Sequence, residues 1–115
     1  MTPLEIGSLK HGAVSSVTLQ GEITLGPAVE HLRQTLANLI QQGDNRLVLN
    51  LAGVRRLDSS GIEVLVWALR TSRESGGDAK LTNVPAFVAR TLSMCRVLPL
   101  FQVFDTDEAA IASFG

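Results

Sequence analysis

Apolar residues along the chain follow two spacings, one typical of strands and one typical of helices. Residues 14–21, VSSVTLQG, mix apolar and polar positions with partial alternation, which predicts a half-exposed strand. Residues 46–53, RLVLNLAG, are almost continuously apolar, which predicts a strand buried on both faces of a sheet. A shorter strand is expected around residues 4–9, and two later strands at residues 79–84 and 101–104.

Four segments have the apolar spacing or the terminal residues of helices. The first opens at Pro27, where the missing N–H is harmless, and stops before a glycine. The second repeats apolar residues at intervals of three and four from Ile62 to Leu69. Two shorter helices are predicted over residues 85–94 and 105–114, the first opened by a proline and the second capped by an aspartate or a threonine.

The order of these elements, two strands followed by alternating helices and strands, indicates the fold class. It predicts an α/β fold in which about four helices pack on a mixed central β-sheet. At 115 residues the chain has the length of one ordinary domain, so we expect a single domain over residues 1–115. Apolar residues make up 45% and charged residues 18%, a balance typical of a chain that folds around its own core.

The charge and cysteine content narrow the possible partners and compartments. The net charge is −1 and, apart from Arg55 and Arg56, basic residues are scattered, so we expect no nucleic-acid binding. Apolar runs are far shorter than the roughly 20 residues that cross a bilayer, so we expect no membrane insertion. A lone cysteine, Cys95, and an N-terminus unlike a signal peptide predict a cytoplasmic protein. The sequence has no excess apolar face, so we expect a monomer in the free state.

The motif LDSSG, residues 57–61, lies between the buried strand and the second helix. Ser60 is followed three residues later by Glu63, which is the spacing of a helix-capping box. With Ser60 as the cap, Ser59 would lie one residue outside the helix, with its hydroxyl facing solvent. Ser59 is therefore the candidate phosphorylation site, and Ser60 is the runner-up. A phosphate there adds a charge of roughly −1.5 to −2 near the positive end of a helix dipole, so the fold should tolerate it while a docked partner should not.

Catalytic and metal chemistry are not favoured by the residues present. A nucleophile elbow needs a glycine two residues before and two residues after its serine, and neither Ser59 nor Ser60 has both. The two histidines, His11 and His31, both precede the motif, and with a single cysteine they give no metal-ligand spacing. No glycine-rich nucleotide-binding motif is present. We therefore expect no enzymatic activity, no catalytic residues, no metal and no cofactor.

Residues 47–69, LVLNLAGVRRLDSSGIEVLVWAL, resemble the segment that defines the STAS domain, the fold of bacterial anti-sigma factor antagonists. The likeness covers nearly the whole chain. VTLQGEI resembles the early strand of the family, AKLTNVPAFVARTLSM a later strand and helix, and LFQVFDTDEAAIASF its ending. The DSSG loop is the specific part of this resemblance, and the rest matches as a pattern.

The resemblance implies a protein–protein switch controlled by phosphorylation. In the family, the unphosphorylated protein binds an anti-sigma factor that is also an ATP-dependent serine kinase, and a sigma factor is thereby released to join RNA polymerase. Phosphorylation of the first serine after the loop aspartate, here Ser59, breaks this binding, and a metal-dependent serine phosphatase restores it. ATP and Mg²⁺ would belong to the kinase.

The resemblance also implies a partner-binding surface, and this chain departs from the family there at two positions. Thr24 stands where relatives often have the acidic residue of GELD, and Glu63 stands where relatives often have a small residue. Both departures favour an alternative function, a STAS scaffold or regulatory subunit of a signalling or lipid-transport complex whose loop serine is not phosphorylated. The predicted partner-binding residues are Thr24, Asp58, Ser59, Ser60, Gly61, Ile62 and Glu63.

Overall fold

The computed structural model describes residues 4–115 and has a single five-stranded mixed sheet. The strand order across the sheet is β1-β2-β3-β4-β5, with β1 antiparallel to β2 and all other neighbours parallel. The strands are β1 (Glu5–His11), β2 (Val14–Ile23), β3 (Arg46–Leu57), β4 (Asp78–Thr82) and β5 (Val103–Phe104). The helices are α1 (Pro27–Gln41), α2 (Ser59–Glu74), α3 (Ala86–Met94), α4 (Asp107–Ser113) and a 3₁₀ turn, η1 (Leu98–Leu100).

This architecture confirms the predicted α/β fold with a mixed sheet and four α-helices within residues 4–115. Every strand has a boundary that differs from the prediction, by one or two residues at the ends of β1 and β4. β2 continues to Ile23 and β3 to Leu57, because the two strands stay paired through two register shifts that break the alternation of apolar residues in the sequence. β5 is shorter than predicted and contains two residues.

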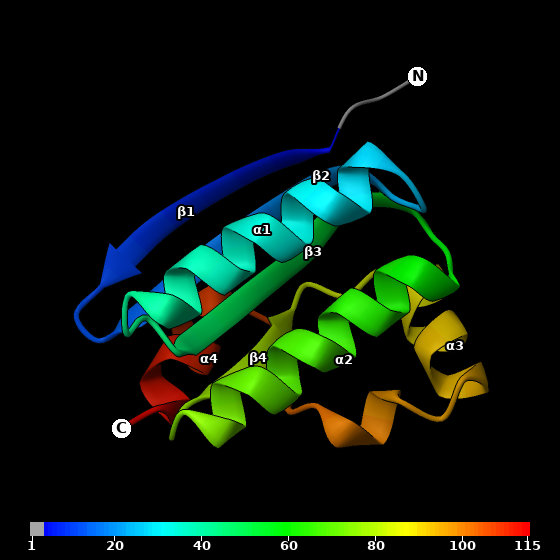
Figure 1. The fold of residues 1–115 in the computed structure, drawn as a ribbon. Coiled ribbons are helices and arrows are strands. Elements are labelled where there is room, and N and C mark those ends of the chain that lie inside the picture. Colours follow the sequence, from blue (N-terminus) through cyan, green and yellow to red (C-terminus); the bar gives the residue numbers. More distant parts are fainter. Residues whose placement is uncertain (1–3) are drawn as a thin grey trace.

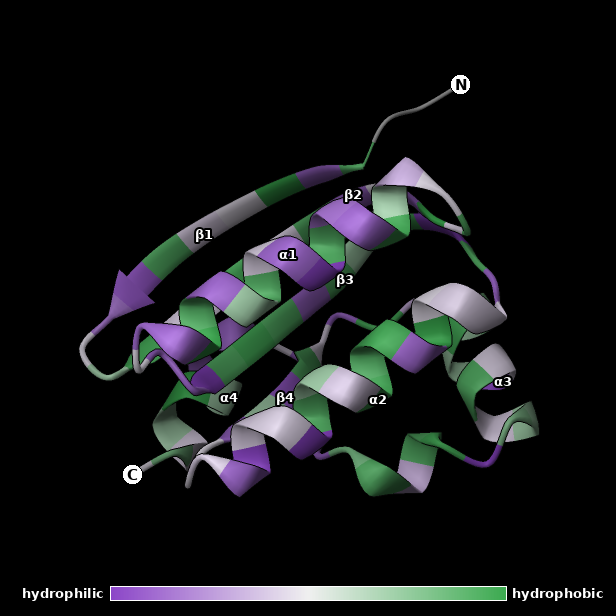
Figure 2. Cartoon of the chain, viewed as in Figure 1, coloured by the Kyte–Doolittle hydropathy of each residue, from purple (hydrophilic) through white to green (hydrophobic). Residues whose placement is uncertain are grey.

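The two helices α1 and α2 lie side by side on one face of the sheet, and α4 lies on the other face (Figure 1). The main core lies between the sheet and the helices α1 and α2. Five fully buried leucines in it come from five different elements: Leu19, Leu36, Leu49, Leu65 and Leu81. Figure 2 shows the matching distribution of hydrophobic residues: β3 is mostly hydrophobic, and the side of α1 that faces away from the sheet is hydrophilic.

The short helix α4 is attached to the opposite face of the sheet by a smaller contact. Ala110 of α4 is buried together with Val48 of β3 in a second apolar cluster. The Asp107 carboxylate, in the first turn of α4, accepts hydrogen bonds from the side chains of Asn50 and Thr82. α4 is short and contacts β2, β3, β4 and β5, and a cavity remains between it and the back of β1 and β2.

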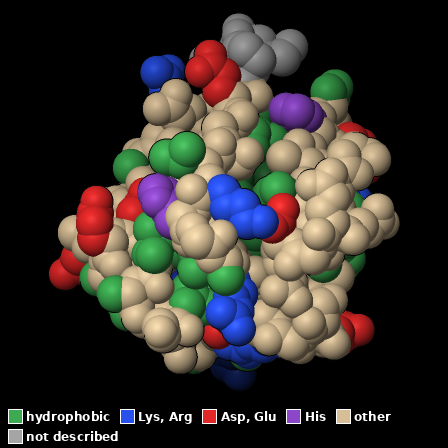
Figure 3. Space-filling view, turned by 90° about the vertical axis from the view of Figure 1, so that its left-hand side faces the viewer, with side chains coloured by type: hydrophobic (Ala, Val, Ile, Leu, Met, Phe, Trp, Pro, Cys, Tyr) green, Lys and Arg blue, Asp and Glu red, His purple; other side chains and the backbone are tan. Residues whose placement is uncertain are grey.

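Charged side chains of both signs are mixed on the surface. In the view of Figure 3, Lys and Arg side chains lie among Asp and Glu side chains and do not form a continuous basic stripe. Lys10 of β1, for example, forms an ion pair with Asp44. Within residues 4–115, no helix combines the length and the apolar character needed to cross a membrane.

The first turn of α2 packs directly against the end of β2 at Gly61. A Cβ atom on Gly61 would lie 2.4 Å from the carbonyl oxygen of Ile23 and 2.8 Å from Cδ1 of Leu57. The N–H of Asp58 donates to the same Ile23 carbonyl, at 3.3 Å. Glycine therefore allows the loop that follows β3 to lie against the loop that follows β2.

The substitution Gly61→Ala should destabilise the protein by about 2 kcal/mol, because the new methyl group overlaps a backbone atom that cannot move away freely. Thermal unfolding followed by circular dichroism should show a melting temperature several degrees lower. Gly7→Ala in β1 is the matched control, because a Cβ there meets no atom within 4 Å. Equal melting temperatures for the two variants would contradict this packing.

Candidate functional site

The carboxylate of Asp58 joins the two loops at the carboxyl ends of β2 and β3. Its Oδ1 accepts a hydrogen bond from the N–H of Gly61 at 3.0 Å and caps the N-terminus of α2. Its Oδ2 accepts a hydrogen bond from the N–H of Leu25 at 2.8 Å, in the loop between β2 and α1. One side chain thus positions both segments that surround the serine motif.

The predicted capping box of Ser60 and Glu63 is wrong. α2 begins at Ser59, and Asp58 is its N-cap residue. Glu63 is exposed, and within residues 4–115 no hydrogen bond connects its carboxylate with Ser60. There are two physical reasons for this difference. The close contact between Gly61 and Ile23 sets where the helix begins. The carboxylate of Asp58 has two acceptor oxygens, so it can bond to the N–H groups of two loops at once.

Ser59 is the first residue of α2 and its side chain is exposed, whereas Ser60 is half-buried. The expected exposure of Ser59 is therefore found, although the residue lies inside the first helical turn. A helix N-terminus carries partial positive charge, so an anionic group on the Ser59 oxygen is favourably placed. Glu63 follows four residues later on the same side of the helix, so it would oppose such an anion.

The structure brings Thr24 next to the serine motif, as the prediction requires. Thr24 and Asp58 line the same small cavity of about 360 Å³, together with Glu22, Arg56 and Leu57. This cavity lies where β2 and β3 end, and its lining is mainly polar and charged.

Two of the predicted partner-binding residues lie below the surface. Gly61 is buried against Ile23, and Ile62 is 7% exposed within the main core. Of the two, Ile62 still lines a surface groove with Glu63 and Trp67, whereas Gly61 lines none of the described cavities. The exposed or half-exposed part of the predicted set consists of Thr24, Asp58, Ser59, Ser60 and Glu63.

One surface residue of this region was missed by the sequence reasoning. Leu25 follows Thr24 in the loop between β2 and α1, and it is 79% exposed. The signal in the sequence was an apolar residue in the segment TLGP, outside the apolar spacing of both neighbouring elements. Only the fold shows that this loop lies beside Ser59, through the hydrogen bond between Leu25 and Asp58.

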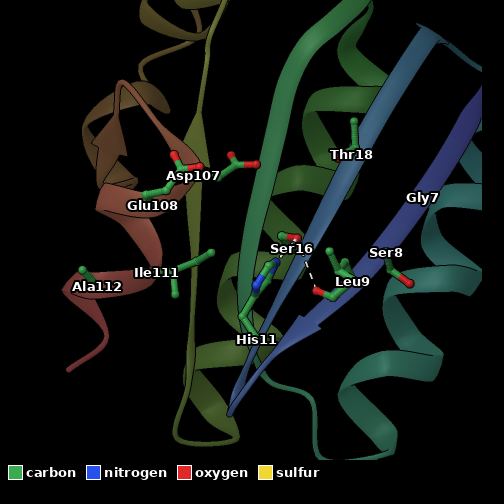
Figure 4. A pocket seen from close by; sticks show the side chains of 10 residues that line it. All are labelled: Gly7, Ser8, Leu9, His11, Ser16, Thr18, Asp107, Glu108, Ile111 and Ala112. Atoms are coloured by element: carbon green, nitrogen blue, oxygen red, sulfur yellow. Dashed lines mark hydrogen bonds between the residues drawn. The ribbon is translucent and has the colours of Figure 1, made fainter.

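A larger cavity of about 680 Å³ lies on the other face of the sheet, between α4 and the back of β1 and β2 (Figure 4). His11 and Ser16 both face this cavity, with His11 Nε2 3.2 Å from Ser16 Oγ. Ser16 Oγ donates its hydrogen to the carbonyl of Leu9, also at 3.2 Å. Asp107 lines the same cavity, but its carboxylate accepts from residues of β3 and β4 rather than from the histidine.

The His11–Ser16 pair is not arranged as a general base and a nucleophile. The proton of Ser16 points to the Leu9 carbonyl, so His11 donates to the serine oxygen instead of accepting from it. No carboxylate within residues 4–115 is hydrogen-bonded to the His11 ring to orient it. In the same part of the chain, no group of three or more His, Cys, Asp or Glu side chains could hold a metal ion.

The environment of Asp58 favours its charged form. The hydrogen bond from the Leu25 N–H lowers the pKa of the Asp58 carboxyl below its usual value, and the N–H groups of Gly61 and Ser60 act in the same direction against the effect of partial burial. A carboxyl whose pKa is lower in the folded than in the unfolded state stabilises the fold above its unfolded pKa. This stabilisation is lost as the pH falls through the folded pKa.

The substitution Asp58→Asn should lower the free energy of unfolding by about 1 kcal/mol at pH 7, because an amide has one acceptor oxygen for two N–H donors. The difference between the two proteins should shrink as the pH falls from the ordinary carboxyl pKa of roughly 4 through the lower pKa of the folded protein, where the wild-type carboxylate takes up a proton. Urea unfolding between pH 7 and pH 3 measures this difference. Asp105→Asn, at an exposed aspartate outside this site, is the control. If the difference in the free energy of unfolding between wild type and Asp58→Asn did not change with pH, the stabilising role of the charged Asp58 carboxylate would be contradicted.

Comparison with known proteins identifies the family of this chain. The family model of the STAS domain matches residues 8–110. BtrV of Bordetella bronchiseptica, named as a candidate anti-sigma factor antagonist, is 29% identical over 96 residues, 84% of this chain and 82% of BtrV. The anti-sigma F factor antagonist of Paenibacillus polymyxa is 26% identical over 109 residues, 94% of this chain and 92% of that protein.

Solved structures of the anti-sigma factor antagonist SpoIIAA show the same fold. The unphosphorylated form matches with a TM-score of 0.73 at 24% identity, covering 99% of this chain and 97% of the other. The phosphorylated form, from Bacillus, matches with a TM-score of 0.72 at 22% identity and covers all of both chains. Since the family model covers nearly the whole chain and the fold agrees, this protein belongs to the STAS domain family.

Proposed function

We propose that this protein is an anti-sigma factor antagonist that acts as a phosphorylation-controlled switch. In its unphosphorylated state it binds an anti-sigma factor that is also a serine kinase, and a sigma factor is released. The observation that carries the proposal is Ser59, an exposed hydroxyl at the start of α2 on a loop held by Asp58. The names of the two curated relatives and the phosphorylated form of SpoIIAA support the same function.

The switch acts on binding and leaves the fold intact. A phosphate on Ser59 adds a charge of roughly −1.5 to −2 at the positive end of the α2 dipole, where the helix accommodates it. A docked partner would have to bury that charge next to Glu63 and Asp58, which are themselves acidic. Affinity for the kinase therefore falls on phosphorylation, and a serine phosphatase restores it. ATP and Mg²⁺ are supplied by the kinase, and this chain needs no cofactor of its own.

Two side chains at the site, Thr24 and Glu63, depart from the pattern that the family resemblance implies. Thr24 brings a neutral hydroxyl to the polar cavity beside Asp58, and Glu63 brings a negative charge one helical turn after Ser59. Charges at an interface rim act mainly on the choice of partner and on the rate of association. We infer that these two residues select the cognate kinase. The switch operates in the cytoplasm, with a monomeric protein in the free state.

The first test is phosphorylation by the serine kinases of the host organism that carry an anti-sigma factor sequence. Each purified kinase is incubated with this protein and Mg²⁺–ATP, and phosphate is located by tandem mass spectrometry. We expect one kinase to modify Ser59. Ser59→Ala should abolish the reaction, and Ser60→Ala, the matched control one residue away, should retain it.

The second test is the affinity of that kinase for the unphosphorylated protein, the phosphorylated protein and Ser59→Asp, measured by calorimetry. The two negatively charged forms should bind at least about ten-fold more weakly, within the usual range of coupling between two sites. Their melting temperatures should stay within a few degrees of the wild type, because Ser59 is exposed. Equal affinities would contradict the switch. An unmodified Ser59 together with a stable complex with transporter subunits or scaffold proteins would favour the scaffold function instead.

A further inference from the structure

Leu25 places an apolar side chain on the surface beside Ser59. Among the large apolar residues of 4–115 it is the most exposed, at 79%. Its neighbour Ile23, two residues earlier in β2, is fully buried, so the chain turns outward between them. Within residues 4–115 Leu25 belongs to neither apolar cluster of the fold. Its side chain therefore contributes little to the stability of the free protein.

The backbone of Leu25 is nevertheless held in place. Its N–H donates to Asp58 Oδ2 at 2.8 Å. The next residue, Gly26, has a φ of 121°, in a region that favours glycine, and Pro27 then starts α1. An apolar side chain on a loop that is already ordered loses little conformational freedom when it enters a pocket of another protein.

The same carboxylate connects Leu25 with the serine motif. Asp58 directly precedes Ser59 in the chain, and its second oxygen caps the helix that Ser59 begins. In Figure 1 the loop between β2 and α1 lies beside the loop between β3 and α2, at the right of the view. A protein that covers Ser59 therefore meets Leu25 in the same contact.

We propose that Leu25 is the apolar anchor of the kinase-binding surface and inserts into an apolar pocket of the anti-sigma factor kinase. This inference rests on the proposed function and extends it, because it names the residue that supplies binding energy next to the residue that is switched. Leu25 lies between polar neighbours, since Thr24 precedes it in the chain and its N–H is bonded to the carboxylate of Asp58, as polar groups surround the apolar centre of an interface. A phosphate on Ser59 then keeps water at the rim and prevents the pocket from closing over Leu25.

A second copy of this chain fits the same surface poorly. A stable dimer buries at least about 1,200 Å² in total, and a single leucine on a short loop provides a small fraction of that area. A symmetric contact would also bring Asp58 and Glu63 of one copy close to the same carboxylates of the other. The kinase, which must approach Ser59 to modify it, is the occupant that this position favours.

The test compares Leu25→Ala with Leu9→Ala in binding to the purified kinase that phosphorylates Ser59. Leu9 of β1 is 64% exposed and pairs with Ser16 near the start of β2, at the other end of that strand from Leu25, so it is a matched control for the loss of an exposed leucine side chain. We expect Leu25→Ala to weaken binding at least about ten-fold. Leu25→Met should retain most of the affinity, and Leu9→Ala should bind like the wild type. All three variants should keep the wild-type melting temperature.

The outcomes separate this inference from the function on which it rests. If Leu25→Ala binds like the wild type while Ser59→Asp does not, the anchor is wrong and the switch stands. If Leu25→Ala loses affinity while Ser59→Asp does not, the anchor stands and the switch is wrong. If the wild type binds none of the host's anti-sigma factor kinases, both are wrong. Sedimentation showing a dimer that disappears in Leu25→Ala would overturn the inference and assign the surface to a second copy.

Discussion

The carboxylate of Asp58 is the interaction on which the functional end of this molecule depends. It accepts N–H groups from two loops whose donors, at Leu25 and Gly61, belong to the ends of different strands. Leu25 and Asp58 are 33 residues apart in the chain, so this bond is a tertiary contact and not a local turn. Glycine at position 61 makes the bond geometrically possible, because the first turn of α2 could not otherwise approach the carbonyl of Ile23.

The buried core and the candidate serine lie at separate positions in this fold. The main core lies between the sheet and the pair of helices α1 and α2, and its buried side chains are almost entirely apolar. Ser59 lies at the rim of that core, at a helix end whose dipole favours an anion. A change of charge there alters what can be brought against the surface, while the packing that holds the domain together stays as it was.

The cavity on the opposite face of the sheet, beside α4, is lined by polar groups that are bonded to the fold. Its serine and histidine, Ser16 and His11, are hydrogen-bonded with the serine proton directed at a backbone carbonyl. Its carboxylate, Asp107, holds α4 against the sheet through Asn50 and Thr82. The bonds of Asp107 attach the short helix to the sheet, and the bonds of Ser16 connect β1 with β2.

The sequence by itself determined the fold class, the family and the identity of the candidate serine, because apolar spacing and the DSSG motif are local properties of the chain. It could not determine which residue caps α2, since serine and aspartate are both favoured there and the choice was made by the contact between Gly61 and Ile23. The length of β2 and β3 was also hidden, because two register shifts interrupt their alternation. The place of Leu25 beside Ser59 was decided by tertiary structure alone, since the two loops meet only when β2 and β3 pair and Asp58 bonds across them.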